Sequence, residues 1–503
     1  MDRVIGSIGG FSRLEACLRL PSRCTGLHCA VLRTASHLPP FLVDRQGSST
    51  TARMASTSST SLRTWLFRQH QAFAQDFASG SLKNWIVCVG NEAGDLDTLA
   101  SSIGFSFFAT LASSQSKGSN PVRKYVPVQQ TKSTDFKLRA ENIEVLKLAN
   151  LMDNEQPDEP MAELICSNRI DFSKLTPYGA QYALLDHNRV NASIFGESAE
   201  VVAVIDHHQP EADDQLYRSA DPRLIQVPTG SCASLVTQHF SSALTASDSI
   251  PPEMADLLLS AIAIDTGNFK SIAEDGKATE SDMTAKQWLK PRSRFAKTLA
   301  TENSSNLSGS GSTGFKDFYK QLSKIQKDVS TLSSTQLLQR DYKQSEVNGW
   351  ALGISSVPLA LEVWIEEKCG GEWSGFLDGL KEHVESKKLD LGSVLTSAFK
   401  PKQSPDRADS SIGPGRRLVL LVTGERRGQI SGLIDQELDN LMADQSLQLS
   451  PLSTTNKPLL KLEAWTSLHN SSVYTFIVAN PSATRKQLTP VLLKLVEKLG
   501  RKS

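Results

Sequence analysis

Two short apolar runs in the middle of the chain each end on an Asp-His pair. Residues 182–185 lead to Asp186 and residues 201–205 lead to Asp206, and a His follows each Asp. Runs of four to six apolar residues rich in Val, Ile and Leu are typical of strands that are buried on both faces of a parallel sheet. Ligands of such sheets bind at the carboxyl ends of the strands. The pattern therefore predicts that two strands deliver Asp and His side chains to one edge of a sheet.

Carboxylates and neutral imidazoles are the side chains that hold Mg²⁺, Mn²⁺ or Co²⁺ in proteins. Either Asp-His pair alone is explained as well by polar residues that cap a loop. Two further apolar segments also end on acids: residues 85–89 lead to Asp95 and Asp97, and the helical or helix–strand unit 253–264 leads to Asp265. Four elements that end on acids predict a binuclear metal site.

The length and charge of the chain limit its architecture and its partners. A chain of 503 residues is too long for one ordinary core and predicts two or three domains. Lys plus Arg and Asp plus Glu both total 54, so any binding of a polyanion must come from a local patch. No run of 18 apolar residues is present, which predicts no transmembrane span. Seven scattered cysteines without a CxxC pair predict a reducing compartment, with no disulfides and no structural zinc.

Residues 1–60 differ from the rest of the chain in composition. They contain seven Arg, no Lys and three acidic residues, and Ser and Thr become frequent toward residue 60. This composition is typical of a mitochondrial transit peptide. The alternative is an unstructured extension that precedes a true start at Met54. We expect a cytoplasmic protein, or a protein of the mitochondrial matrix if the segment is a transit peptide, and in both cases residues 1–60 stay outside the fold.

The remaining apolar segments predict an α/β protein with two domains. In the first domain, residues 62–295, helices alternate with strands, which predicts a mostly parallel sheet. Residues 296–314, which are rich in Gly, Ser and Asn from residue 300 onward, predict a flexible linker. Residues 315–503 predict a smaller α/β domain. The expected strands are residues 85–89, 125–129, 182–185, 201–205 and 224–227 in the first domain, and residues 350–357, 418–423 and 473–478 in the second.

Two helices are expected to begin close to the predicted metal site. Asp97 and Thr98 can cap a helix that continues through Leu111. Residues 229–234, with the sequence TGSCAS, open a second helix, and Gly with hydroxyl residues at a helix N-terminus predicts a site for an anion. An ordinary capped helix explains the same six residues equally well.

The four motifs together resemble the DHH phosphoesterase superfamily, which is named for the triplet that stands here as Asp206, His207 and His208. The resemblance covers about residues 62–290. Within the superfamily the chain is similar to the branch of type II inorganic pyrophosphatases, Prune proteins and fungal-type exopolyphosphatases, and it most resembles the last. Its motif GNEAGDLD is similar to the exopolyphosphatase form, whereas the pyrophosphatases have His in place of Asn91. The branch implies an N-terminal DHH domain and a C-terminal DHH-associated domain that binds phosphate.

The resemblance also implies two divalent metal ions, Mg²⁺ or Mn²⁺, with Co²⁺ as a further option. Asp186 would bridge the two ions. The amide of Asn91 is a weaker ligand than imidazole, so we expect a preference shifted toward Mg²⁺. The implied ligands are Asn91, Asp95 and Asp186 for one ion, and Asp97, Asp186, His207 and Asp265 for the other.

Further residues are implied to act on the phosphate. His208 would face it, and Asp206 would orient the neighbouring His. In the second domain Lys343 follows Asp341-Tyr342, and the pair Arg485-Lys486 opens the last helix and resembles a basic signature of the pyrophosphatases. The implied catalytic residues are His208, Asp206 and Lys343, and the implied substrate-binding residues are His208, Lys343, Arg485 and Lys486.

The function implied by the resemblance is that of a hydrolase, an exopolyphosphatase that releases orthophosphate from the end of linear polyphosphate. The metal ions are expected to lower the pKa of a shared water, and the linker is expected to let the domains close. The alternatives are an inorganic pyrophosphatase of the DHH type and a Prune-like interaction protein with residual phosphohydrolase activity. A nuclease is disfavoured because no aromatic cluster lies near the motifs. We expect polyphosphate as the partner, no nucleic acid or membrane partner, and a monomer.

Overall fold

The computed structural model of the chain describes most of the sequence from residue 61 onward. The Arg-rich segment, residues 1–60, and most of the predicted linker lie outside the described residues. The described residues are 61–115, 123–210, 216–244, 250–274, 276–296, 314–398, 415–452, 465–480 and 483–502.

The first sheet contains six strands in the order β3-β2-β1-β4-β5-β6, and every neighbouring pair is parallel. This confirms the predicted parallel sheet. The strand order reverses between the central strands β1 and β4, and such a switch point is where open α/β sheets bind ligands. The strands are β1 (Trp85–Gly90), β2 (Lys124–Gln129), β3 (Ile165–Cys166), β4 (Gln181–Leu185), β5 (Glu200–Asp206) and β6 (Arg223–Ile225).

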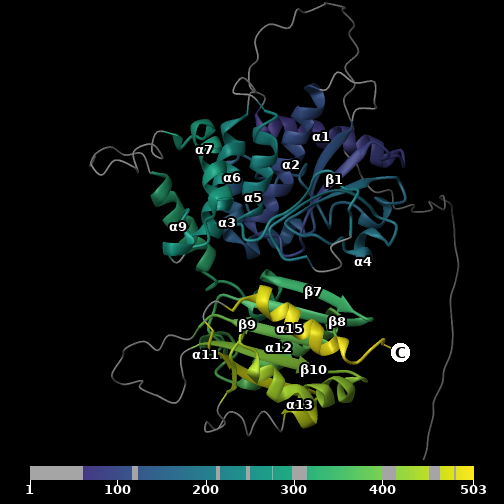
Figure 1. Cartoon of the computed structure of the whole chain (residues 1–503), viewed down its shortest axis with the longest axis vertical. Helices are drawn as coiled ribbons and strands as arrows, with labels where there is room; N and C mark the ends of the chain where they lie inside the picture. The colour runs from purple at the N-terminus through teal and green to yellow at the C-terminus, as the bar shows by residue number, and fades with distance from the viewer. Residues whose placement is uncertain are drawn as a thin grey trace, which may run out of the picture. The chain divides into compact units, whose positions relative to one another are not determined.

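Both faces of this sheet are buried, as the continuous apolar runs predict. Alternate residues of β1 belong to different cores: Ile86 and Cys88 pack under one group of helices, and Val87 and Val89 pack on the opposite face. Figure 1 shows α2, α5 and α6 side by side in the first group. No described helix is long and apolar enough to cross a membrane. The helices are α1 (Leu62–Ala78), α2 (Leu96–Gln115), α3 (Ala140–Leu148), α4 (Ala192–Phe195), α5 (Cys232–Ser241), α6 (Pro252–Thr266) and α7 (Glu280–Leu289), with the short 3₁₀ turns η1 (Ser133–Leu138), η2 (Phe172–Lys174), η3 (Ile272–Glu274) and η4 (Lys290–Arg292).

The second sheet also contains six strands, in the order β11-β12-β10-β9-β8-β7. Its neighbouring strands are antiparallel except for the parallel pair β8 and β9. Helices cover both faces, with α13 and α15 on one and α10, α11 and α12 on the other. The strands are β7 (Tyr342–Val347), β8 (Trp350–Val357), β9 (Leu391–Thr396), β10 (Arg416–Val422), β11 (Leu449–Pro451) and β12 (Ser472–Val478), and the helices are α10 (Ser334–Arg340), α11 (Leu361–Lys368), α12 (Trp373–Ser386), α13 (Arg427–Ala443) and α15 (Arg485–Glu497).

One helix after the predicted linker packs with the first core. Phe315 and Leu322 of α9 (Phe315–Lys327) are fully buried in the core that contains α2, α5 and α6. We therefore propose that the boundary between the two domains follows α9 instead of preceding it. The second core then begins with α10, whose Leu337 and Leu338 pack under the second sheet.

Candidate metal centre

Three strands of the first sheet end side by side and set the positions of the predicted site residues. Gly90 of β1 lies opposite Leu185 of β4, and Leu185 lies opposite Ile205 of β5. The residues that follow Gly90 and Leu185 are Asn91 and Asp186. The carboxyl edge of the sheet therefore presents Asn91, Asp186 and the Asp206 motif on adjacent strands, as the sequence predicts.

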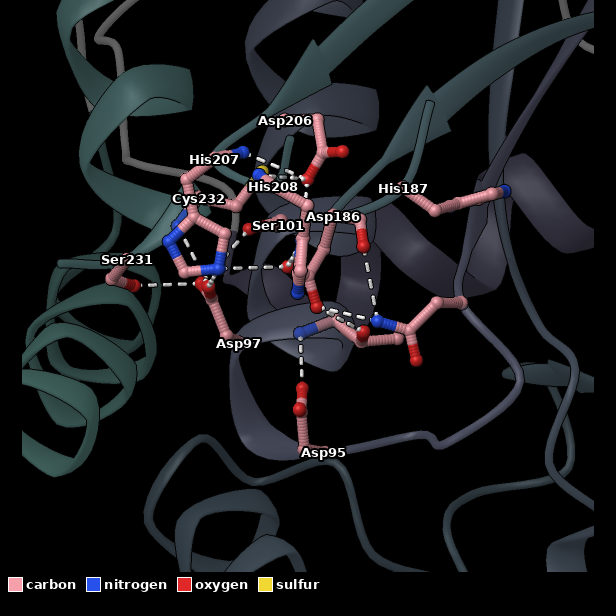
Figure 2. A network of polar contacts seen from close by, with 12 residues as sticks. Asp95, Asp97, Ser101, Asp186, His187, Asp206, His207, His208, Ser231 and Cys232 are labelled. Atoms are coloured by element: carbon pink, nitrogen blue, oxygen red, sulfur yellow. Dashed lines mark hydrogen bonds and ion pairs between the residues drawn. The ribbon is translucent and has the colours of Figure 1, made fainter. Parts of the chain in front are cut away.

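Asp186 lies at the centre of the cluster. Its backbone φ of 64° is left-handed, a conformation that few residues other than Gly adopt and that is found at functional sites. Its Oδ2 accepts hydrogen bonds from Asn91 Nδ2 at 2.7 Å and from Thr98 Oγ1 at 2.6 Å. Its Oδ1 is buried and has no hydrogen-bond partner within the described part of the chain. Figure 2 shows Asp97, His207 and His208 grouped around Asp186.

The approach of Thr98 to Asp186 depends on Gly90. A Cβ atom on Gly90 would lie 2.2 Å from Thr98 Cγ2, closer than packed atoms approach. Glycine at the end of β1 thus lets the first turn of α2 lie directly against the sheet. Asp95 Oδ1 accepts the Thr98 N–H at 2.9 Å, so Asp95 caps α2, and the prediction that Asp97 and Thr98 form the cap was wrong.

The imidazole ring of His207 is oriented with Nε2 toward the carboxylates of Asp97 and Asp186. Its Nδ1 lies 3.1 Å from the Thr229 carbonyl oxygen, which can only accept a hydrogen bond. The Nδ1–H therefore donates to Thr229, and the neutral ring presents the lone pair of Nε2. That nitrogen lies 3.2 Å from Asp186 Oδ1 and 3.8 Å from Asp97 Oδ2. A lone pair that faces two carboxylates requires a proton or a cation between them.

Asp206 lies behind both histidines. Its Oδ1 accepts the N–H groups of His207 and His208 at 2.7 and 3.1 Å and contacts His208 Nδ1 at 2.7 Å. Its Oδ2 accepts a hydrogen bond from Asn188 Nδ2 at 2.7 Å, which joins the two strand-end motifs. Because Nδ1 of His208 is held by Asp206, Nε2 is the ring atom available to a ligand. These contacts agree with the orienting role expected of Asp206, which stays a prediction.

Asp97 occupies the N-terminus of α5. Its carboxylate accepts the N–H groups of Cys232 and Ala233 at 2.6 and 2.8 Å and the hydroxyl of Ser231 at 2.7 Å. Asp282 accepts the preceding N–H groups of Gly230 and Ser231. The chain's own carboxylates thus occupy the predicted anion site, so the ordinary capped helix is the correct reading. Burial, reinforced by the charge of Asp186, raises the pKa of Asp97 to about 6.

Asp265 comes from a helix and not from a strand. It lies in the last turn of α6, and its Oδ2 is buried without a hydrogen-bond partner among the described residues. Burial, and then the charges of Asp97, Asp95 and Asp186, raise the pKa of Asp265 well above its usual range. Carboxylates that crowd together in this way repel one another unless a cation balances them.

His187, in contrast, points away from the cluster in Figure 2, and its Nδ1 contacts the Leu185 carbonyl oxygen.

The predicted phosphate-binding cations lie in the second half of the chain. Lys343 lies on β7. Burial has the largest effect on the pKa of Asp186, which it raises, and on the pKa of His208, which it lowers; the charge of Lys343 is a smaller influence that lowers both pKa values. The charge of Lys486, after burial and the contact with Asp186, acts to lower the pKa of His207. Arg485 differs, because its Nη1 already donates to the backbone and side-chain oxygens of Asp341 at 2.8 and 3.0 Å.

Two family models match the two halves of this architecture. The model of the DHH family, N-terminal domain, matches residues 85–262, and that of the DHHA2 domain matches residues 320–495. The chain belongs to the DHH family. This confirms the resemblance seen in the sequence.

Curated relatives of this DHH protein extend over most of its length. "Exopolyphosphatase PRUNE1" of Rattus norvegicus is 25% identical over 408 residues, which span 81% of this chain and 74% of that protein. A relative from Schizosaccharomyces pombe is 26% identical and spans 82% of this chain and 91% of its own. "Manganese-dependent inorganic pyrophosphatase" of Methanocaldococcus jannaschii is 25% identical over 229 residues, 44% of this chain and 60% of that protein. A solved structure from Methanococcus jannaschii gives a TM-score of only 0.46 at 20% identity, covering 82% of this chain and 99% of that one, and adds no weight to the assignment.

The DHH site residues fit a divalent cation best on the side of His207. Asp186 Oδ1 and Asp265 Oδ2 are buried oxygen atoms without hydrogen-bond partners in the described regions. His207 Nε2 lies 3.2 Å from Asp186 Oδ1 and 3.8 Å from Asp97 Oδ2. The side of Asn91 is arranged differently. The Asn91 amide nitrogen donates to Asp186, and its Oδ1 accepts the Ala93 N–H at 2.9 Å. Asn91 thus holds the predicted bridging carboxylate in place.

Three supporting residues of the DHH site were missed in the sequence. Thr98 and Asn188 hold Asp186 and Asp206, and the Thr229 carbonyl fixes the ring of His207. Thr98 directly follows the Asp97 motif, and Asn188 directly follows Asp186-His187, so adjacency was a usable signal for both. The sequence carries no signal for Thr229, because a backbone carbonyl is present at every residue.

Proposed function

We propose that this chain is an exopolyphosphatase, a metal-dependent hydrolase that removes the terminal phosphate of linear inorganic polyphosphate and releases orthophosphate. The observation that carries the proposal is the cluster of Asp97, Asp186 and His207, toward which the charges of Lys343 and Lys486 act from the DHHA2 half. Relatives that span four-fifths of the chain and bear the name exopolyphosphatase support it.

The metal-binding residues in this proposal are Asp97, Asp186, His207 and Asp265, with Asn91 and Asp95 beside a second ion. A divalent cation, Mg²⁺ or Mn²⁺, supplies charge that lowers the pKa of water and balances the phosphoryl oxygens. The carboxylates provide the negative charge that such an ion needs. Thr229 fixes the His207 ring, so that little reorganisation is needed when the ion binds.

His208 contributes a ring nitrogen of defined orientation. Burial, despite the opposing contact with Asp206, lowers the pKa of His208, so the ring is neutral near pH 7 in the free chain. Asp206 holds the proton on Nδ1, which leaves Nε2 to accept a proton or a hydrogen bond from the substrate side.

The cations of the DHHA2 half provide the second set of contacts to the phosphate chain. Neither Lys343 nor the exposed Lys486 forms an ion pair within the described part of the chain, so their charges are available to phosphate oxygens. Arg485 is held by Asp341 and presents its guanidinium in a fixed orientation. Several cations near the metal centre suit a substrate with several phosphates. The cytoplasmic location and the monomeric state expected from the sequence stay predictions.

The test is the product of the reaction on long-chain polyphosphate. The purified chain with Mg²⁺ should release orthophosphate from the first minutes, while the remaining polymer shortens gradually on a gel. Early fragments of intermediate length without orthophosphate would overturn the exo-acting mode. Asp317→Asn is the matched control for variants of the acidic ligands, since Asp317 is exposed and pairs with Lys320 on the surface of α9.

A second candidate is an inorganic pyrophosphatase. The match to the manganese-dependent inorganic pyrophosphatase supports it, and the same metal centre would serve both substrates. The ratio of the two hydrolysis rates separates the candidates, because a pyrophosphatase makes no use of cations beyond those that hold two phosphates.

A further inference from the structure

The loop between β1 and α2 is bonded at two points to the second half of the chain. The metal loop, residues 91–95, carries Asn91 and Asp95 at its ends. In its middle, Glu92 Oε1 accepts the backbone N–H of Gln344 on β7 at 2.6 Å. β7 is an edge strand of the second sheet, so this N–H lies on a strand with one unpaired side. Glu92 therefore ties the metal loop directly to β7.

The second point runs through Arg139. Arg139 Nε donates to the carbonyl oxygen of Ala93, the next residue of the metal loop, at 2.9 Å. Its Nη2 donates to Asp341 Oδ1 at 3.2 Å, and the same oxygen accepts from Arg485 Nη1 at 3.0 Å. Burial disfavours the charge of Asp341, but Arg485 and Arg139 outweigh it and lower the pKa of this carboxyl to about 2. One carboxylate oxygen thus joins the metal loop to the first turn of α15.

The two bonded positions bracket Lys343. Asp341 lies two residues before it and Gln344 lies one residue after it. The chain is thus bonded to the metal loop on both sides of Lys343, through Arg139 and the Asp341 side chain on one side and through the Gln344 backbone on the other. The side chain of a strand residue follows from its backbone position. Any displacement of the metal loop relative to β7 therefore changes the distance between Lys343 and the metal centre.

We propose that Glu92 and Arg139 are positioning residues that hold Lys343 at the metal centre as a two-point clamp. The inference rests on the proposed function, because it assigns a purpose to Lys343 at that site. The clamp sets where the phosphate next to the metal centre meets its cation. Glu92 and Arg139 themselves do not touch the reacting atoms.

A different contact holds the two halves of the chain together. Arg340 of α10 donates to Glu141 of α3 at 3.1 and 3.3 Å and to the Leu138 carbonyl oxygen at 2.9 Å, and both charged side chains are buried. This contact involves neither the metal loop nor β7. Loss of the Glu92 contact alone should therefore leave the fold in place, which makes Glu92 the better residue to test.

The test is a double-mutant cycle of Glu92→Ala and Lys343→Ala with polyphosphate as the substrate. If Glu92 acts by placing Lys343, then Glu92→Ala lowers kcat/KM by about tenfold when Lys343 is present and by less than about twofold when it is absent. Losses that multiply independently would overturn the clamp.

Glu92→Gln keeps an oxygen that can accept the Gln344 N–H, so its kcat/KM should stay within about threefold of the wild-type value. If Glu92→Ala does not fold, the cycle is made with Glu92→Gln instead. The proposal is then overturned if Glu92→Gln lowers kcat/KM as much as Lys343→Ala does and the two losses show no coupling.

The matched control is Glu362→Gln. Glu362 accepts a hydrogen bond from the buried Arg417 at 2.7 Å inside the second half of the chain, away from the metal loop. This variant should lower thermal stability and leave kcat/KM unchanged.

A failure of the clamp can be told apart from a failure of the proposed function. If the wild-type chain releases no orthophosphate from polyphosphate, the function fails, and the cycle is repeated on the binding of imidodiphosphate in the presence of Mg²⁺. Coupling in that binding would sustain the clamp without the function. Hydrolysis by the wild type without coupling would sustain the function and remove the clamp.

Discussion

The Nε2 atom of His207 lies 3.2 Å from Oδ1 of Asp186, and the other ring nitrogen faces the Thr229 carbonyl oxygen. Two atoms that both carry lone pairs are thus held together in a buried site. Burial opposes a charged ring, but the contact with Asp186 and the charges of Asp186 and Asp97 outweigh it and raise the pKa of His207. A proton on Nε2 is therefore favoured at lower pH, and a metal ion that binds the two residues must replace it.

Metal binding is therefore expected to release protons. Mn²⁺ should release more protons when it binds at pH 6 than at pH 9, because the pKa values of His207, Asp97 and Asp265 are all raised and each ligand must lose its proton before it binds the ion. Calorimetry in buffers of different ionisation enthalpy measures the number of protons released. A proton count that does not change with pH would contradict the exchange.

Asp97 and Asp282 offer a matched pair at the N-terminus of α5. Asp97 accepts backbone N–H groups in the first turn of this helix, and Asp282 accepts the backbone N–H groups that directly precede it. Asp97→Asn and Asp282→Asn should therefore each lower the free energy of unfolding by about 1–3 kcal/mol. His207 faces Asp97, so we expect Asp97→Asn to weaken Mn²⁺ binding at least tenfold, whereas Asp282→Asn should bind normally. Urea unfolding and a metal titration give the two quantities. Equal loss of Mn²⁺ affinity in both variants would show that α5 capping, and not the Asp97 ligand, governs binding.

His383 should make the stability of the chain depend on pH. Burial, together with the charge of Lys387, lowers the pKa of His383 to about 4 in the folded chain, below its usual value near 6.5. The unfolded chain therefore binds the proton first as the pH falls, and stability is lost from about pH 6.5 down to pH 4. Between pH 7 and pH 5 the wild type should lose about 2 kcal/mol more than His383→Leu. Equal pH dependence of the two chains in urea unfolding would contradict this assignment.

The sequence predicted best those features that lie within a single buried strand and the residues that follow it. Residues 182–185 and 201–205 are buried on both faces, so their apolar runs are continuous, and the polar residues that follow mark the sheet edge. β7 was missed because it is an edge strand, in which the residues after Tyr342 alternate between partial and full exposure. Its composition is therefore that of a surface loop.

Long-range contacts could not be read from the sequence. Asp97 was predicted as a metal ligand, but its bonds to α5 join residues more than 130 positions apart. Arg485 was predicted to bind phosphate, and its bonds to Asp341 span 144 positions. Each contact depends on how elements that are distant in the sequence pack against one another, which no local pattern records.

The most direct measurement is orthophosphate release from long-chain polyphosphate and from pyrophosphate, side by side, with Mg²⁺ and then with Mn²⁺. We predict rapid release from the polymer and little from pyrophosphate. We also predict a loss of at least about a thousandfold in Asp186→Ala, because this change removes the carboxylate at the centre of the cluster, and wild-type rates in Asp317→Asn. Release from pyrophosphate alone, or an Asp186→Ala variant with wild-type activity on polyphosphate, would contradict the account.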